Sequence, residues 1–413
     1  MSRQERFRVA IRKFAPFESA IQKQWAAFET LEKTGLQLET EALDLHPLSE
    51  SLFGNEGLLR GAWDVSFIST DWLALIDQTR SVVDLAPFLQ ADPPEGYPSG
   101  WTPSLLRMQQ FGSSVLGVPY HDGPECLIYR RDLLEDPQEQ AAYLRRFGAP
   151  LQAPRTWDEF HRIARFFHRP EQGLYGTAFA AYPDGHNTVY DFLLQLWTRG
   201  GELFDPAGRI RFATPQAIEA LTFYRSMLQD SAAVHPRCRE MDSVQSGLAF
   251  AAGEIAMMVN WFGFGAMSET IAESRVKGRV GIAEIPHGEG ASSVSLSVYW
   301  ILSIAAGSPH IEIAYRFLRH CLSERMDKLL TLEGGIGCRR STWNDAEVNR
   351  SVPLYGELEK LHAGAREMPR MVKWPQVAEI IDRMVLEAIH TSEPIEQIAG
   401  RAESSTGLCL EKS

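Results

Sequence analysis

The sequence is poor in lysine and has no long hydrophobic run. Only eight of the 41 Lys and Arg residues are lysine, and 53 Asp and Glu residues leave a net charge of −12. An acidic balance of this size argues against a surface for nucleic acid or for anionic membranes. The longest apolar stretch, residues 298–306, has nine residues, whereas a membrane-spanning helix needs about twenty. We therefore expect no transmembrane segment.

Cysteine is scarce, and its spacing indicates no metal site. The five cysteines, at positions 126, 238, 321, 338 and 409, include no C-x-x-C pair. An odd number of cysteines without such pairs leaves at most two disulfides and no zinc-type cluster. Each cysteine is equally well interpreted as a small buried apolar residue.

Catalytic motifs are also missing. The sequence lacks G-x-S-x-G, G-x-x-x-x-G-K-[ST], G-x-G-x-x-G and H-E-x-x-H. Residues 274–277 match S-x-x-K and residues 33–35 match K-T-G, but K-T-G should follow the serine, and no S-D-N is present. His161 and His168 have no thiol or carboxylate ligand pattern beside them, so we interpret them as surface residues. We expect no enzyme activity, no metal and no cofactor.

The first ten residues do not have the pattern of a signal peptide. They read MSRQERFRVA and carry charges without an apolar segment after them. Two interpretations stay open: a cytosolic protein, or a mature secreted chain in which a start methionine replaces the leader.

The N-terminal region alternates between strand and helix patterns. Arg6–Phe14 alternates charged and apolar residues, which predicts a strand, and Phe17–Thr34 has apolar residues at helical spacing. Leu36–Leu43 alternates again, and Val65–Ile68 is a short apolar run. Strand, helix and strand in this order predict an open α/β sheet. The length of 413 residues suggests two or three such domains.

Further elements are predicted along the rest of the chain. Thr156 with Glu159 three residues later is a capping box that opens a helix. Val294–Ile304 is predicted to be one long strand or a strand pair, and Glu312–Leu332 one helix. The tail, Tyr355–Ile398, is predicted to be helical without a strand.

Aromatic and polar residues gather where the predicted strands end. Ligands of open α/β sheets bind outside the carboxyl ends of the strands. A planar ring presents an apolar face to the C–H side of a sugar, while carboxylates and amides bind its hydroxyls. We therefore favour a binding function for these segments, which are residues 12–17, 69–72, 120–125, 182–187, 260–264 and 299–300.

At these segments the chain resembles the family 1 extracellular solute-binding proteins of bacterial ABC importers, which includes the maltose-binding protein. Pro154–Phe160 (PRTWDEF) and Gly200–Asp205 (GGELFD) match the family pattern most closely. The similarity covers nearly the whole chain. The other blocks, in the family's order, are Gly61–Val65, Leu85–Leu89, Gly117–Tyr120, Leu127–Arg130, Phe250–Met257, Val280–Pro286, Ile304–Ser308 and Met368–Trp374.

The resemblance implies a two-lobed α/β fold, the type II periplasmic binding protein fold, with a ligand cleft between lobes joined by hinge crossovers. The N-lobe would comprise residues 1–117 and 298–337, and the C-lobe residues 118–297 and 338–413. The protein would be a monomer that captures a sugar or related polyol and delivers it to ABC permease subunits, which work with a cytoplasmic ATPase. It would lie in the periplasm or outside the cell, associated with the membrane through the permease.

The family's ligand-binding positions transfer to this sequence residue by residue. The resemblance implies ligand contacts from residues of both lobes. These are Lys13, Phe14, Asp71, Trp72, His121, Asp122, Tyr182, Asp184, Asn187, Trp261, Trp300 and Trp374. Trp63 replaces the family's usual proline, so its ring would be available to the cleft, and Cys338 would either pair with Cys321 or stay a separate buried thiol.

Two alternatives to sugar capture stay open. A carbohydrate-active enzyme such as a glycoside hydrolase would need two carboxylates about 5–9 Å apart. A binding protein for a charged solute is the other: Arg12 and Lys13 would suit a sugar phosphate, whereas Asp71, Asp122 and Asp184 would suit a cation.

Overall fold

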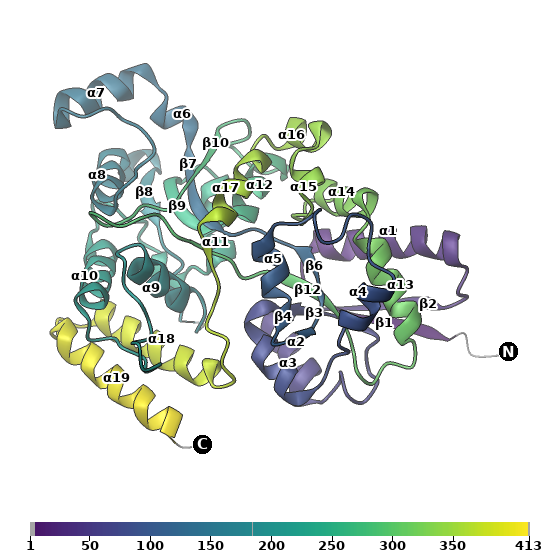
Figure 1. The fold of residues 1–413 in the computed structure, drawn as a ribbon. Coiled ribbons are helices and arrows are strands. Elements are labelled where there is room, and N and C mark those ends of the chain that lie inside the picture. Colours follow the sequence, from purple (N-terminus) through teal and green to yellow (C-terminus); the bar gives the residue numbers. More distant parts are fainter. Residues whose placement is uncertain (1–4, 184, 412–413) are drawn as a thin grey trace. The chain divides into compact units, whose positions relative to one another are not determined.

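The computed structural model describes residues 5–183 and 185–411, which divide into two units that are each considered separately (Figure 1). The lobes expected from the sequence differ from these units mainly at residues 338–363, which pack within unit 1. Asp184 lies outside the described residues. Unit 1 contains the described residues up to 123, 297–363 and 367–372, and unit 2 contains 124–296, 364–366 and the described residues from 373.

Unit 1 is built on a five-stranded sheet in the order β2-β1-β3-β12-β6. The first three strands are parallel, while β12 runs antiparallel between β3 and β6. All five side chains of β3 are buried, as expected of a central strand covered on both faces. The strands are β1 (Arg6–Arg12), β2 (Gln37–Leu43), β3 (Val65–Ser69), β6 (Val118–His121) and β12 (Trp300–Ile304).

Helices cover the sheet of unit 1, and α1 packs beside α13 (Figure 1). The helical spacing seen in the sequence of α1 places Trp25 and Phe28 on its buried face, where both rings contact Phe317 of α13. The elements are α1 (Ala15–Glu32), α2 (Leu45–Ser49), η1 (Glu50–Gly54), η2 (Thr70–Trp72), α3 (Leu73–Thr79), α4 (Ala86–Ala91), α5 (Pro103–Met108), β4 (Gln110–Phe111), β5 (Ser114–Val115), α13 (Ile311–Cys321), α14 (Glu324–Leu332), α15 (Arg340–Trp343), α16 (Ala346–Ser351), η5 (Tyr355–Glu357) and α17 (Leu358–Ala363).

Unit 2 contains a four-stranded sheet in the order β10-β7-β9-β8 and a two-stranded pair, β11 and β13. The C-terminal helices α18 and α19 pack side by side (Figure 1). Its elements are β7 (Glu125–Arg130), α6 (Arg131–Leu134), α7 (Pro137–Phe147), α8 (Trp157–Phe167), η3 (Pro170–Gln172), β8 (Tyr175–Ala178), α9 (Asn187–Trp197), α10 (Pro215–Gln229), η4 (Cys238–Glu240), α11 (Ser243–Ala251), β9 (Ile255–Trp261), α12 (Phe262–Thr270), β10 (Val280–Ala283), β11 (Ser295–Leu296), β13 (Ala365–Arg366), α18 (Trp374–His390) and α19 (Ile395–Glu411).

Most predicted elements are confirmed, and the structure differs from the prediction in three segments. The capping box of Thr156 and Glu159 is present at the start of α8. The predicted helix over residues 312–332 is wrong, because Ser323 is extended (φ −64°, ψ 154°) and starts a second helix, α14. The segment 294–304 holds two strands in different sheets, and β13 is a strand in the tail that the pattern did not predict, since two residues show no period. Every described helix is too short or too polar to cross a lipid bilayer.

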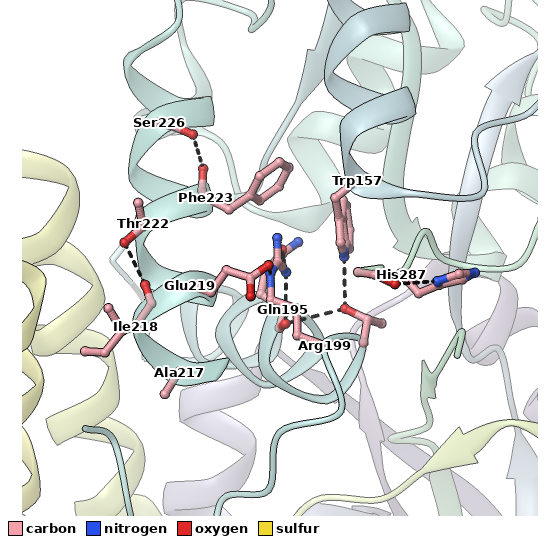
Figure 2. A network of polar contacts seen from close by, with 12 residues as sticks. Trp157, Gln195, Arg199, Ala217, Ile218, Glu219, Thr222, Phe223, Ser226 and His287 are labelled. Atoms are coloured by element: carbon pink, nitrogen blue, oxygen red, sulfur yellow. Dashed lines mark hydrogen bonds and ion pairs between the residues drawn. The ribbon is translucent and has the colours of Figure 1, made fainter. Parts of the chain in front are cut away.

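A buried arginine joins three helices of unit 2 (Figure 2). The Arg199 guanidinium donates to the Gln195 side-chain oxygen at 2.6 Å and to Glu219 at 3.0 Å. It lies over the Phe223 ring, 4.8 Å from the centroid, and burial lowers the pKa of Arg199. Trp157 of α8 donates to Thr198 at 3.0 Å on the same side of α9. Residues of α8, α9 and α10 therefore share one polar network.

We expect Arg199→Ala to destabilise unit 2 by about 3 kcal/mol, because it removes the centre of a buried network and leaves a cavity. Glu219→Ala should cost less than about 1 kcal/mol, because the Glu219 side chain is 65% exposed. Denaturant unfolding of the two variants measures the difference. Equal losses for both would contradict a network centred on the arginine.

All five cysteines are free thiols in the described structure, and four of them are buried. Burial raises the pKa of Cys321 and of Cys338 well above the ordinary value. Of the two interpretations left open by the sequence, the structure therefore has the separate buried thiols. Cys409 is partly exposed.

A thiol-titration experiment should find one reactive cysteine, Cys409, in the native protein and five after unfolding. The reactive species is the thiolate, and burial suppresses both its formation and its access to reagent. Cys409→Ser should abolish the native reaction. A mass lower by two hydrogens without reductant would instead show a disulfide.

Candidate functional site

Four predicted ligand residues of unit 1 meet at one edge of its sheet. Phe14 follows β1, Trp72 follows β3, and His121 ends β6. Trp300 begins the antiparallel β12 and is paired in register with both Ser69 and His121. Because these positions share the carboxyl edge of the parallel strands, the topology brings together residues far apart in sequence. We call Phe14, Trp72, His121 and Trp300 the unit 1 edge.

Ring contacts hold the unit 1 edge in place. The Trp72 and Trp300 rings meet edge to face with centroids 5.9 Å apart. Phe14 lies 6.3 Å from the His121 ring and remains 36% exposed. Such edge-to-face pairs fix ring orientation and leave the apolar faces of the outer rings available to a ligand.

His121 is a neutral hydrogen-bond donor. Its Nδ1 accepts the backbone N–H of Ile336 at 2.8 Å, so the ring proton of the neutral form is on Nε2. Burial lowers the pKa of His121 to about 4, although the charge of Asp122 acts in the opposite direction. At neutral pH the unit 1 edge therefore presents an uncharged imidazole.

The cations beside this edge are already paired. Arg12 and Lys13 both contact Asp44, at 3.2 and 3.5 Å. The hydrogen bond from Arg12 is the largest cause of the lowered pKa of Asp44. The predicted ligand residue Lys13 is thus exposed but shares its partner with Arg12.

Asp122 is buried and paired inside unit 1. Its side chain is 2% exposed, and His362 Nε2 donates to its Oδ2 at 2.6 Å. Its role as a ligand residue stays a prediction. Trp63 is also internal, since it is 7% exposed and donates to Ser51 at 3.2 Å.

Unit 2 has a comparable edge at the ends of its sheet strands. Glu125, the first residue of β7, is in register with Trp261, the last residue of β9. The Trp261 ring meets Tyr190 of α9 edge to face at 5.6 Å. Asn187 starts the same helix, and the exposed Tyr182 follows β8 in the chain. We call Glu125, Tyr182, Asn187, Tyr190 and Trp261 the unit 2 edge.

Glu125 is a buried acid whose pKa is raised in the folded protein. It is 5% exposed, and its Oε2 has no hydrogen-bond partner among the described residues. Burial raises the pKa of Glu125 well above its ordinary value, and the charge of Asp191 raises it further. Asp191 in turn accepts a hydrogen bond from Tyr224 at 2.6 Å. A protonated carboxyl group of this kind both donates to and accepts from a hydroxyl.

The remaining predicted residues are placed as follows. Asp71 lies in η2 of unit 1, next to Trp72. Trp374 begins α18 in unit 2 and is 4% exposed.

Sequence reasoning placed Glu125 in the candidate segment 120–125 without naming it as a ligand residue, and it did not point to Tyr190. Glu125 had a usable signal, because it is a lone acid that enters an apolar strand, ECLIYR. Tyr190 had none, since it belongs to an apolar helix in which ten of eleven residues are buried.

Comparisons with known proteins agree on one group. A family model described as "Bacterial extracellular solute-binding protein" matches residues 15–328. A "Probable ABC transporter-binding protein" of Deinococcus radiodurans is 24% identical over 336 residues, which are 79% of this chain and 75% of that protein.

Solved structures show the same fold. MalE3 of T. maritima with maltose bound has a TM-score of 0.84 and 21% identity over 98% of this chain and 99% of its own. A solute binding protein of Agrobacterium radiobacter in complex with ribitol has a TM-score of 0.85 and 21% identity over 98% of each chain. One of Agrobacterium vitis with D-mannitol has a TM-score of 0.81 and 17% identity over 99% of each. The chain thus has the two-lobed α/β fold of periplasmic binding proteins.

Proposed function

As this chain belongs to the family of bacterial extracellular solute-binding proteins, we propose that it captures a neutral sugar or polyol for an ABC importer. The chain is the solute-binding component of such an importer. The chemical class of its ligand is what we propose. The unit 1 edge and the unit 2 edge are each proposed, taken separately, as a source of ligand contacts. The periplasm or the outer cell surface is the proposed location, with the permease as partner.

The neutrality of the polar groups among the rings carries this proposal. Burial lowers the pKa of His121 to about 4 and raises the pKa of Glu125, so both shifts favour the uncharged form. Trp72 and Trp300 share the unit 1 edge with His121, and Trp261 shares the unit 2 edge with Glu125. Uncharged donors and acceptors between aromatic rings match a ligand with alternating hydroxyl and C–H surfaces. The maltose, ribitol and mannitol of the structural relatives have this chemistry.

Charged ligands fit the site less well. A sugar phosphate would compete with Asp44 for Arg12 and Lys13. A cationic ligand would compete with His362 for Asp122, because the two side chains are hydrogen-bonded inside unit 1. Arg12, Lys13 and Asp122, three of the residues that kept these alternatives open, are therefore already engaged.

A thermal-shift screen against neutral sugars and polyols tests the proposal. A ligand that binds only the folded state stabilises it by about 2.7 kcal/mol at a hundredfold excess over Kd. Sugar phosphates, amino acids and a polyamine are the charged controls. Stabilisation by a charged control and by no neutral compound would overturn the ligand class.

The same samples test for catalysis. Members of this family bind solutes, and we propose that this chain likewise performs no chemistry on its ligand. Incubation with an oligosaccharide should return it unchanged from a stable complex. Release of shorter sugars would favour the glycoside hydrolase instead.

A further inference from the structure

The chain passes between the two units five times, and contacts inside unit 1 join residues close to the first three passages. The passages fall at 123/124, 296/297, 363/364, 366/367 and 372/373. Asp122, Tyr299 and His362 of unit 1 each lie within three positions of one of the first three passages and carry a buried side chain with a polar group. Each is therefore placed to fix one passing segment.

Helix α5 and His362 join these segments. Tyr299 Oη donates to the backbone oxygen of Leu105 in α5 at 2.6 Å. Ser104, the preceding residue, has its Oγ 3.1 Å from His362 Nδ1. His362 Nε2 donates to Asp122 Oδ2 at 2.6 Å. One short helix thus holds the second and third segments, and His362 connects the third to the first. We call Ser104, Asp122, Tyr299 and His362 the crossing clamp.

The crossing clamp is buried and packed. All four side chains are at most 7% exposed. The His362 ring stacks on Trp343 with centroids 5.2 Å apart and planes 7° apart. The backbone N–H of Asp122 also donates to Ile336 at 2.9 Å. A buried polar network with these bonds rigidifies its surroundings, whereas losing one member leaves costly unpaired groups.

A glycine lies within two residues of the clamp at two of the passages. Gly123, next to Asp122, has φ 140°, a backbone conformation that other residues rarely adopt. Gly364 follows Ala363 at the third passage. A rigid anchor followed by a permissive residue confines rotation to a short stretch of chain, as expected of a hinge.

We propose that the crossing clamp is a positioning device for ligand capture, with His362 as its central residue. It holds the passing segments in unit 1 so that rotation is confined to the residues just beyond them. This rests on the proposed solute-binding function, since only a protein that closes on a ligand needs such confinement. Ser104, His362 and Asp122 are residue types of a hydrolase triad, but here Ser104 is buried and also bonded to Thr102 at 3.0 Å.

Three variants test the clamp. His362→Leu removes both hydrogen bonds, whereas His362→Gln keeps a donor for Asp122 and an acceptor for Ser104. His320→Leu is the matched control, because His320 is a partly buried histidine of unit 1 on α13 that packs against Phe28. The His320→Leu substitution should change the stability of unit 1 without altering a residue next to a passage between the units.

Two measurements are made on each variant, well below its unfolding temperature. In ligand-free protein, the amide hydrogen of Asp122 should exchange at least about tenfold faster in His362→Leu, and at the wild-type rate in His362→Gln and His320→Leu. With a sugar or polyol found by the screen, the dissociation rate constant should rise about tenfold in His362→Leu alone, because the closed state is less favoured.

The outcomes separate the two proposals. Unchanged exchange in His362→Leu, or equal acceleration in His320→Leu, overturns the clamp whatever the ligand is. Accelerated exchange with an unchanged dissociation rate shows that the network is only structural and also overturns the positioning role. If no neutral compound binds, the proposed function fails, and the clamp's role in capture fails with it, while the exchange data still report on the network.

Discussion

Trp261→Ala is expected to weaken sugar or polyol binding by about 10- to 100-fold. The variant removes the ring at the end of β9 that meets Tyr190, and burial of such a side chain against a ligand contributes about 1.5–3 kcal/mol. Calorimetric titration with the compound found by the screen measures the change in Kd.

Two further variants make this result specific. Trp261→Phe keeps an aromatic face and should lose less affinity than the alanine variant. Leu144→Ala, in the exposed part of α7 of the same unit, should leave Kd unchanged. An alanine variant that folds normally and binds with wild-type affinity would remove Trp261 from the site.

Glu125→Gln is expected to alter how the stability of the protein depends on pH. Burial raises the pKa of the Glu125 carboxyl group above the value of about 4.5 that it has in the unfolded chain. Between the two pKa values the folded state binds more protons at Glu125 than the unfolded state does. The contribution of Glu125 to the free energy of unfolding is therefore complete below about pH 4.5 and is lost as pH rises through the folded pKa. Each pH unit between the two pKa values lowers the free energy of unfolding by about 1.4 kcal/mol.

Unfolding curves at pH 4 and pH 8 test this sign. Relative to wild type, Glu125→Gln should gain stability between pH 4 and pH 8, by roughly 2–4 °C in Tm per kcal/mol for a domain of this size. The amide also keeps neutral hydrogen bonding, so binding should survive, whereas Glu125→Leu should weaken it. A constant difference between variant and wild type across this range would show that Glu125 is ionised in the folded state.

The fold could be predicted in its local elements because their patterns lie within a few residues. The alternation of Arg6–Phe14 and the helical spacing of Phe17–Thr34 correspond to β1 and α1. The break at Ser323 was invisible, because the apolar spacing continues across it into α14 and only the backbone shows the turn.

The site was predictable in part, for a different reason. Aromatic residues next to strand ends, such as Trp72 and Trp300, follow from where strands stop. Whether a polar side chain is already paired depends on distant partners: Asp122 contacts His362, which is 240 positions away in the sequence. Glu125 is also a buried acid, but its Oε2 has no hydrogen-bond partner among the described residues.

The central place of β12 in the sheet of unit 1 also sets an order for biogenesis. Its residues, 300–304, are synthesised well after β3 and β6, the two strands between which they lie. Until they are synthesised, β3 is a buried-type strand with an open edge, which is a hazard for aggregation. Unit 1 therefore cannot complete its sheet until nearly three quarters of the chain has been made.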